Sequence, residues 1–282
     1  GGSVVTALVL SIIWPFAQGA LNNFGQWIAT SQDTAPILAP FVYGAGERLL
    51  LPFGLHHMLT IPMNYTELGG TYEILTGSNA GQIVAGQESL WLAWVTDLNN
   101  LKSAGDMEAY NSLLNAVTPA RFKAGQVILS TASLMGAAFA MFRNVDSDKK
   151  SAYKSMFISA ALATFLTGVS EPLEFMFMFI SPVLYLCYAI LAGLAFALAD
   201  IINLRVHAFG AIELITRVPM MINAGLLGDV INFAIACLAF FGINFGVFSF
   251  CIKKFKIPTP GRLGNYDEEE SSDSTKEAAV DK

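Results

Sequence analysis

The sequence predicts an all-α, polytopic membrane protein, and three observations carry that prediction. Of the 282 residues, 54% are hydrophobic and only 13% are charged, whereas soluble domains carry about 25% charged residues. The mean hydropathy is +0.52. Several apolar runs also approach the ~20 residues that a helix needs to cross a bilayer. These features together predict helices that span a membrane.

Five apolar runs are candidate spans, and the first can be extended towards Trp27. They are Val4 to Phe16, Phe122 to Phe142, Met156 to Ile180, Val183 to Ile202, and Leu226 to Ile252. The chain begins with Gly-Gly-Ser and not with Met. We therefore expect it to be a fragment of a longer protein.

Basic residues indicate the topology, because cytoplasmic loops are enriched in Lys and Arg. One basic cluster follows the Phe122 span and another, from Lys253 to Lys256, follows the last span. If both clusters are cytoplasmic, one of the three apolar runs between them must enter and leave on the same side. Met156 to Ile180 is the candidate, because Gly168 and Pro172 interrupt it. We expect a re-entrant hairpin with Glu171 near its tip, although Arg205 and Arg217 then fall on the outer side.

A second interrupted region runs from Ala35 to Thr66. Its apolar runs are about ten residues long, too short to span a bilayer, and four prolines punctuate it, namely Pro36, Pro40, Pro52 and Pro62. This pattern predicts a second re-entrant hairpin. Two interrupted segments in a transporter indicate a binding site between them.

The remaining segments are polar. Gly69 to Arg121 is rich in Gly, Asn and Thr, and Trp91 and Trp94 suggest a stretch at the membrane interface. From Pro258 onward the composition predicts a disordered tail. The predicted division is therefore a membrane domain over residues 1–257 and a linker over residues 258–282.

Charge and cysteine content exclude several classes of function. The net charge is −6, which argues against nucleic acid as a partner. The three cysteines, Cys187, Cys237 and Cys251, lie in apolar runs without metal-binding spacing, so we expect no metal site. There is no phosphate-binding loop of nucleotide-binding spacing, and the chain should not hydrolyse ATP.

Glu171 and Glu174 are the only charged residues between Ser155 and Ala199. A charge at membrane depth costs about 3 kcal/mol, so it marks a functional site by default. Glu171 is a candidate base for an alcohol, or else a structural carboxylate that caps a helix or pairs with Arg48. Glu174 lies one helical turn later and could share that face, but a structural hydrogen bond is at least as plausible for it.

His56, His57 and Arg48 are the polar candidates in the other interrupted region. Adjacent helical residues point about 100° apart, so we expect only one of the two histidines to face a ligand. Arg48 offers a rigid fork of donors suited to a carboxylate, a phosphate or sugar hydroxyls. Alternatively, Arg48 pairs with Glu47 or extends towards the membrane interface.

These segments resemble a known family. The run Gly44-Ala45-Gly46-Glu47-Arg48 through Leu55-His56-His57 is similar to the "GLHH" segment of bacterial phosphotransferase-system sugar permeases, enzyme IIC of the glucose superfamily. Thr167 to Phe175 resembles that family's "GITEP-[IL]-E-F" signature, with Val169 and Ser170 replacing Ile and Thr. Thr259-Pro260-Gly261-Arg262 looks like the stretch that leads into the IIB domain.

The resemblance implies a sugar substrate and a phosphoryl group supplied by a phosphocysteine on IIB, in the same chain or another, without a cofactor. It places Glu171, His56 and Arg48 at the sugar, with Glu171 and His56 at the hydroxyl that is phosphorylated. We add Ser170, His57 and Glu174 as neighbouring sugar contacts. It further implies that the chain lacks an amino-terminal half through which such permeases form homodimers.

The sequence therefore predicts the carboxy-terminal part of a sugar permease in the bacterial inner membrane, surrounded by lipid, with a cytoplasmic carboxy terminus. Such a chain would be the membrane component of a sugar phosphotransferase, although the fragment alone is expected to be inactive. The segments Ile61 to Thr66 and Gly69 to Tyr72 look closest to maltose-type members. The alternatives are a proton-coupled sugar transporter, in which Glu171 and His56 relay protons, and a sugar sensor without transport.

Overall fold

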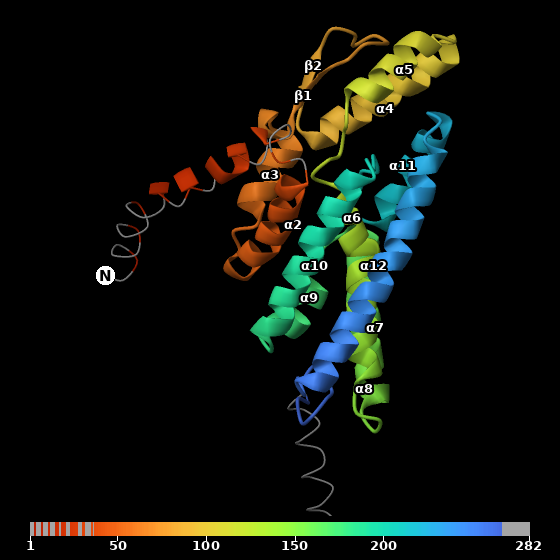
Figure 1. The fold of residues 1–282 in the computed structure, drawn as a ribbon. Helices are drawn as coiled ribbons and strands as arrows, with labels where there is room; N and C mark the ends of the chain where they lie inside the picture. The colour runs from red at the N-terminus through yellow and green to blue at the C-terminus, as the bar shows by residue number, and fades with distance from the viewer. Residues whose placement is uncertain are drawn as a thin grey trace, which may run out of the picture. The chain divides into compact units, whose positions relative to one another are not determined.

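The computed structural model describes residues 37–266 throughout, together with positions 3, 7, 11, 15, 16, 18–20, 23–27, 30, 31 and 35 (Figure 1). The predicted span from Val4 to Phe16 lies mostly outside the described residues. The described residues are predominantly helical, as the composition predicted. The elements of the first half are α2 (Leu38–Leu50), η1 (Leu51–Phe53), α3 (His57–Tyr65), η2 (Glu67–Gly69), β1 (Thr71–Glu73), β2 (Ile83–Ala85), α4 (Gln87–Ala104) and α5 (Met107–Ala116).

The second half is helical in the described residues. Its elements are α6 (Ala124–Ile128), the π-helical turn η3 (Leu129–Ser133), α7 (Leu134–Arg143), α8 (Lys150–Thr167), α9 (Glu171–Met178), α10 (Pro182–Ile201), α11 (Ala211–Asn223) and α12 (Leu227–Lys254). The elements α6, η3 and α7 follow one another without a break and form one continuous helix of 20 residues, Ala124–Arg143.

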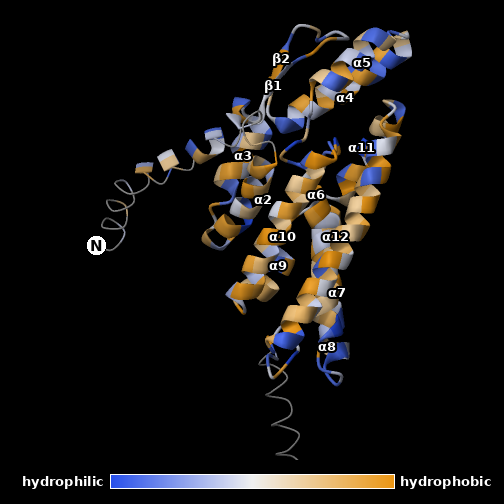
Figure 2. Cartoon of the chain, in the orientation of Figure 1, coloured by the Kyte–Doolittle hydropathy of each residue, from blue (hydrophilic) through white to orange (hydrophobic). Residues whose placement is uncertain are grey.

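Three of the described helices are long and apolar enough to cross a membrane: Ala124–Arg143, α10 and α12. They coincide with three of the predicted spans. Orange, hydrophobic residues dominate α10 and α12 in Figure 2. On α12, large apolar side chains such as Leu238 and Phe250 are exposed by 75% and 63%. Exposed apolar side chains of this size are expected where a helix faces lipid.

The chain divides into two compact units. The first comprises residues 1–126, 189–208 and 214–233, and the second comprises residues 127–188, 209–213 and 234–282. Because α10, α11 and α12 each run from one unit into the other, the units are not separate along the sequence.

The core of the first unit contains a group of packed aromatic rings. The ring of Tyr43 on α2 lies 5.4 Å from that of Phe122 and 5.5 Å from that of Phe196, measured between centroids. Gly44 and Gly125 both face Phe196, and a Cβ at either position would overlap its ring. The two glycines are therefore required for this close packing.

A small β-hairpin stands in the polar segment between α3 and α4. Strands β1 and β2 pair antiparallel, with Tyr72 opposite Val84. Buried Asp97 on α4 accepts hydrogen bonds from the Tyr72 hydroxyl at 2.7 Å and from the backbone N–H groups of Leu75 and Thr76 at 2.8 and 2.9 Å. This carboxylate therefore fixes the hairpin to α4.

Both tryptophans of α4 lie inside the protein, whereas the sequence suggested a position at the membrane interface. Trp91 and Trp94 are fully buried, and the Trp91 indole N–H donates to the carbonyl of Arg205 at 2.7 Å. Packing within the first unit accounts for both side chains.

In the second unit, α8 packs against α7 and α9. The ring of Phe177 on α9 packs against aromatic rings of α10 and α12. The centroid of the Phe177 ring lies 5.5 Å from that of Tyr188 and 5.0 Å from that of Phe248, and both pairs are edge to face. On α7, Gly136 allows the backbone of Phe241 to approach closely.

The first nine residues of the predicted disordered linker form a hydrogen-bonded turn, which we call the strap (residues 258–266). Asp146 accepts from the Leu263 N–H at 3.0 Å and from the Tyr266 hydroxyl at 2.5 Å. Gly261, at φ = +75°, lies against Val145 and Tyr153. These contacts with the α7–α8 loop explain why the strap adopts a defined structure. Residues 267–282 lie outside the described part of the chain.

Candidate functional site

The histidine segment lies on a turn between two short helices of the first unit. Helices α2 and α3 have 13 and nine residues and contact each other, so neither is long enough to span a bilayer. Gly54 ends η1 in the left-handed conformation, at φ = +70°, which glycine adopts without strain. The predicted interruption is therefore present, while its insertion into a membrane stays a prediction.

His56 and His57 enter α3 with their rings adjacent. The ring centroids lie 3.9 Å apart, and the planes differ by 37°. His56 is buried and His57 is exposed, and His57 Nδ1 lies 3.5 Å from the Thr60 hydroxyl. The sequence predicted that the two side chains point in different directions, whereas their rings lie side by side.

Arg48 lies on α2 beside its neighbour Glu47, and both side chains are almost fully buried. The guanidinium Nη2 donates to Glu47 Oε1 at 2.5 Å. The structure thus shows the ion pair that was the alternative explanation for Arg48. A buried pair of this kind does not exclude a further contact with a ligand, because guanidinium carries five N–H donors.

The glutamate segment of the second unit is organised by a glycine turn. Helix α8 ends at Gly168, which has φ = +81°. A Cβ on Gly168 would overlap the carbonyl oxygen of Phe209, and one on Gly210 would overlap the backbone next to Gly168. Ser130 donates to the same Phe209 carbonyl at 2.9 Å. The turn that precedes Glu171 is therefore held by backbone packing as well as by its own conformation.

Glu171 is the first residue of α9 and is half-buried. The N-terminus of a helix stabilises negative charge, because its N–H dipoles point towards it. Pro172 follows, where its missing N–H is not needed. A carboxylate side chain is thus favourably placed at the start of α9.

Glu174 has a structural partner. It is fully buried and accepts a hydrogen bond from the Tyr188 hydroxyl at 2.8 Å. Ser170, the residue before α9, is buried, and its carbonyl accepts from the N–H groups of Leu173 and Glu174 at 3.1 Å. The alternative reading of Glu174, a structural hydrogen bond, is therefore observed.

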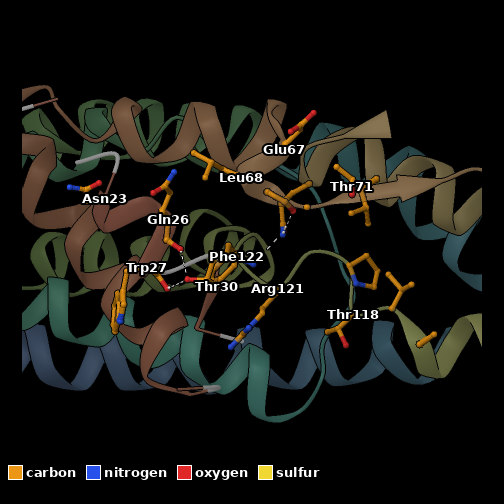
Figure 3. A pocket seen from close by; sticks show the side chains of 17 residues that line it. Asn23, Gln26, Trp27, Thr30, Glu67, Leu68, Thr71, Thr118, Arg121 and Phe122 are labelled. Carbon is orange, nitrogen blue, oxygen red and sulfur yellow. Dashed lines mark hydrogen bonds between the residues drawn. The ribbon is translucent and has the colours of Figure 1, made fainter. Parts of the chain in front are cut away.

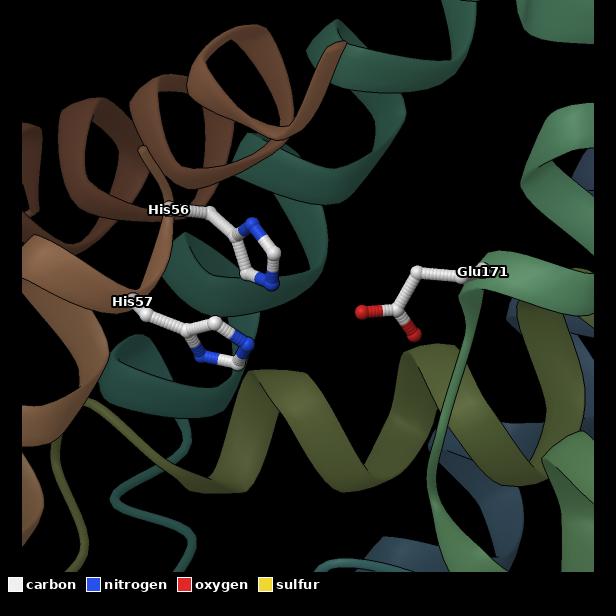
Figure 4. A group of neighbouring side chains, drawn as sticks. All are labelled: His56, His57 and Glu171. Atoms are coloured by element: carbon white, nitrogen blue, oxygen red, sulfur yellow. The ribbon is translucent and has the colours of Figure 1, made fainter. Parts of the chain in front are cut away.

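Figure 4 shows the side chains of His56, His57 and Glu171 on the segments that carry them. His56 and His57 leave the chain where α3 begins, and Glu171 leaves it at the start of α9. Imidazole can give or take a proton near neutral pH, and carboxylate can accept one from an alcohol. Each segment thus presents a proton-handling group at the end of a short helix.

The sequence did not indicate a cluster of charged side chains in the first unit. Buried Arg217 forms an ion pair with Glu88, donates to the carbonyl of His207 at 3.2 Å, and stacks 5.1 Å from the Trp91 ring. Burial, aided by the positive charges of Lys123 and Arg217, holds the pKa of His207 well below its usual value. Arg217 is therefore paired inside the first unit.

The first unit also contains a polar cavity of about 790 Å³ (Figure 3). Trp27, Gln26, Glu67 and Arg121 are among the side chains that line it, and Arg121 pairs with Asp200 at 3.1 Å. The lining comes from three stretches far apart in the sequence, so no local motif could have indicated it.

Comparisons with known proteins identify the family. The sequence profile described as "Phosphotransferase system, EIIC" matches residues 2–193. The chain belongs to this family. It is 58% identical over 273 residues to the glucose-specific EIICBA component of Streptococcus pneumoniae, which covers 97% of this chain and 38% of that protein.

Two further relatives are less similar and are named for other sugars. The maltose-specific EIICB component of Escherichia coli is 31% identical over 258 residues, 92% of this chain and 45% of that protein. The glucoside-specific EIICBA component of Staphylococcus carnosus is 31% identical over 265 residues, 92% of this chain and 34% of that protein. The chain thus spans less than half the length of these relatives. With its three long apolar helices, this EIIC chain is a membrane protein.

Proposed function

We propose that this EIIC chain forms the sugar-translocating part of a permease that carries its substrate across the bacterial inner membrane by alternating access and presents it for phosphorylation. The observation that carries the proposal is the alignment of 97% of the chain with a glucose-specific component of the phosphotransferase system. The maltose- and glucoside-specific relatives support the same class of function.

Glucose is the substrate that we propose first. The sequence suggested maltose, from the segments around Asn64 and Gly70. However, identity to the glucose-specific relative is 58%, against 31% for each of the other two. A larger share of the substrate-facing surface is therefore expected to be common with the glucose-specific protein.

We assign the chemistry to the two motifs. The sugar hydroxyl oxygen attacks the phosphorus of a phosphocysteine on EIIB, the P–S bond breaks, and the thiolate leaves. Glu171 accepts the hydroxyl proton and His56 donates a hydrogen bond to the same hydroxyl, while Arg48 orients the sugar or the phosphoryl group. Phosphoryl transfer depends mainly on such positioning and charge stabilisation. Support comes from the motifs and from the position of Glu171 at a helix N-terminus.

The other three predicted contacts differ in how directly we expect them to touch the sugar. His57, exposed beside His56, would line the sugar site, and Ser170 would contact the sugar next to Glu171. Glu174 would act on the sugar only through the position of α9, because Tyr188 already engages its carboxylate.

An EIIB domain is the partner that this chemistry requires. All three relatives are named as fused EIICB or EIICBA components, which supports an EIIB domain joined through the strap and residues 267–282. We propose a cytoplasmic carboxy terminus, because the phosphoryl donor acts there, and re-entrant insertion of the α2–α3 and α8–α9 segments. Dimerisation through further helices also remains part of the proposal.

Dependence on the phosphoryl donor tests the proposed function. Inside-out vesicles that contain the full permease are loaded with labelled glucose and supplied either with phosphorylated EIIB or with an imposed pH gradient. We expect sugar phosphate to form only with phosphorylated EIIB. Release of unmodified glucose from the vesicles driven by the pH gradient alone would instead establish the proton-coupled alternative, and binding without flux would indicate a sensor.

A further inference from the structure

An apolar groove of about 240 Å³ lies between α7 and α8 in the second unit. The groove is lined by Ala138, Phe139, Phe142, Phe157 and Ile158, with Lys154 at its rim. The rings of Phe142 and Phe157 pack 5.7 Å apart at the centroids. Phe139 and Ile158 are exposed by 49% and 54%. The groove is therefore an open hydrophobic slot on a helix that is apolar enough to cross a membrane.

Positive charge gathers at one end of the groove. Lys150 and Lys154 are one helical turn apart on α8 and share the face that carries Phe157, Ile158 and Ala161. Both lysines are exposed, and among the described residues neither forms an ion pair. The groove thus has apolar side chains along its length and positively charged ammonium groups near one end.

The two acids of the loop between α7 and α8 do not cancel this charge. Asp146 accepts hydrogen bonds from Leu263 and Tyr266 in the strap. Asp148 is the other acid of the loop between α7 and α8, against the cations Arg143, Lys149, Lys150 and Lys154. The loop and the start of α8 therefore carry an excess of two positive charges.

We propose that this groove binds an anionic phospholipid, with an acyl chain along Phe139 and Ile158 and the phosphate at Lys154. A basic site beside an apolar helix surface is the arrangement that recognises anionic headgroups at a membrane.

Quenching of a tryptophan placed in the groove tests this site. The four native tryptophans are at positions 14, 27, 91 and 94, so the unsubstituted permease gives the background. The Phe139→Trp protein is reconstituted with phosphatidylglycerol or phosphatidylcholine that carries bromine on its acyl chains. We expect the introduced indole to be quenched at a several-fold lower mole fraction of phosphatidylglycerol than of phosphatidylcholine.

Two lysine variants distinguish specific lipid binding in the groove from nonspecific attraction of the protein's positive charge to anionic lipid. Lys154→Gln in the Phe139→Trp background should weaken the preference for phosphatidylglycerol about fivefold, the effect of about one surface lysine. Lys254→Gln removes the same charge from an exposed lysine that does not line the groove, and it should leave the preference intact. Equal losses in the two variants, or equal quenching by both lipids, would refute the proposal.

A second readout does not depend on the tryptophan substitution. Short-chain phosphatidylglycerol should raise the thermal unfolding midpoint of the unsubstituted permease more than short-chain phosphatidylcholine does, and Lys154→Gln should abolish the difference. An introduced indole that neither brominated lipid quenches would show that protein covers the groove, and the lipid site would then be wrong.

Discussion

At the scale of single residues, the two acids of α9 differ in their surroundings. Glu171 is half-buried at the first position of the helix. Glu174, one turn later, is fully buried and accepts a hydrogen bond from Tyr188. Two carboxylates three residues apart can therefore have separate roles, one towards a substrate and one towards the packing of α9 on α10.

This difference predicts unequal effects of two matched substitutions. Glu171→Gln removes the proton acceptor and should lower the rate of sugar phosphorylation at least 100-fold, as expected for loss of a general base. It should preserve part of the sugar affinity, because an amide still forms hydrogen bonds. Both quantities are measured in vesicles with phosphorylated EIIB and by equilibrium binding of labelled glucose.

Glu174→Gln is the control for that measurement. Its amide oxygen can still accept from the Tyr188 hydroxyl, so folding and most of the phosphorylation rate should be retained. A normal rate in Glu171→Gln, or an equal loss in both variants, would overturn the assignment of Glu171.

At the scale of elements, the α8–α9 turn depends on Gly168. Alanine at a left-handed position costs about 1–2 kcal/mol by itself. At Gly168 its Cβ would also collide with the backbone of Phe209, so the backbone must move. The segment that carries Glu171 therefore cannot keep its position when Gly168 is replaced.

Gly105 provides a matched control for this turn. It ends α4 at φ = +79°, and a Cβ there would meet nothing within 4 Å. Gly105→Ala should lower stability by about 1–2 kcal/mol only, while Gly168→Ala should cost more and reduce sugar phosphorylation. Thermal unfolding and the vesicle assay measure the two effects. Similar losses of stability would show that the contact with Phe209 is unimportant.

The strap should respond to pH through Asp146. Hydrogen bonds from the Tyr266 hydroxyl, and to a lesser extent from Leu263, lower the pKa of Asp146 below its usual value. A carboxyl whose pKa is lower in the docked state stabilises docking above its free pKa of about 4. That contribution is lost as pH falls through the lowered pKa.

Hydrogen exchange at the Leu263 amide can measure this loss. Protection, corrected for the intrinsic exchange rate, should fall as the pH decreases below about 4, and Asp146→Asn should remove the pH dependence. Tyr266→Phe should weaken docking and reduce the dependence. Protection that is constant with pH in the unsubstituted protein would show that the Asp146 carboxylate does not hold the strap.

At the scale of the whole molecule, the sequence predicted the structural features that are determined by continuous apolar runs. The apolar run Phe122 to Phe142 corresponds to the helix Ala124–Arg143, and Leu226 to Ile252 corresponds to α12. The interruption before Glu171 was also predictable, because Gly168 and Pro172 favour a break. Each of these features is determined within about 20 residues.

Contacts between distant residues could not be predicted in this way. The β1–β2 hairpin depends on Asp97, more than 20 residues along the chain, and the order of the strap depends on Asp146, 120 residues before Tyr266. Composition alone indicated a polar segment and a disordered tail at these places. For the site, sequence motifs indicated Glu171 and His56, whereas the partner of Glu174 on α10 was not predictable from them.

The choice of sugar is a property of the whole substrate-binding surface, and it gives the final prediction. Phosphorylation of labelled glucose by the full permease is competed with unlabelled glucose, maltose and methyl α-glucoside, with phosphorylated EIIB in excess. Given 58% identity to a glucose-specific relative and 31% to the other two, we expect glucose to compete at concentrations at least tenfold lower than maltose. Sites built to hydrogen-bond a substrate discriminate strongly, because a wrong substrate leaves buried polar groups unpaired. Stronger competition by maltose would show that the segments around Asn64 and Gly70, which resemble maltose-type members, determine the specificity.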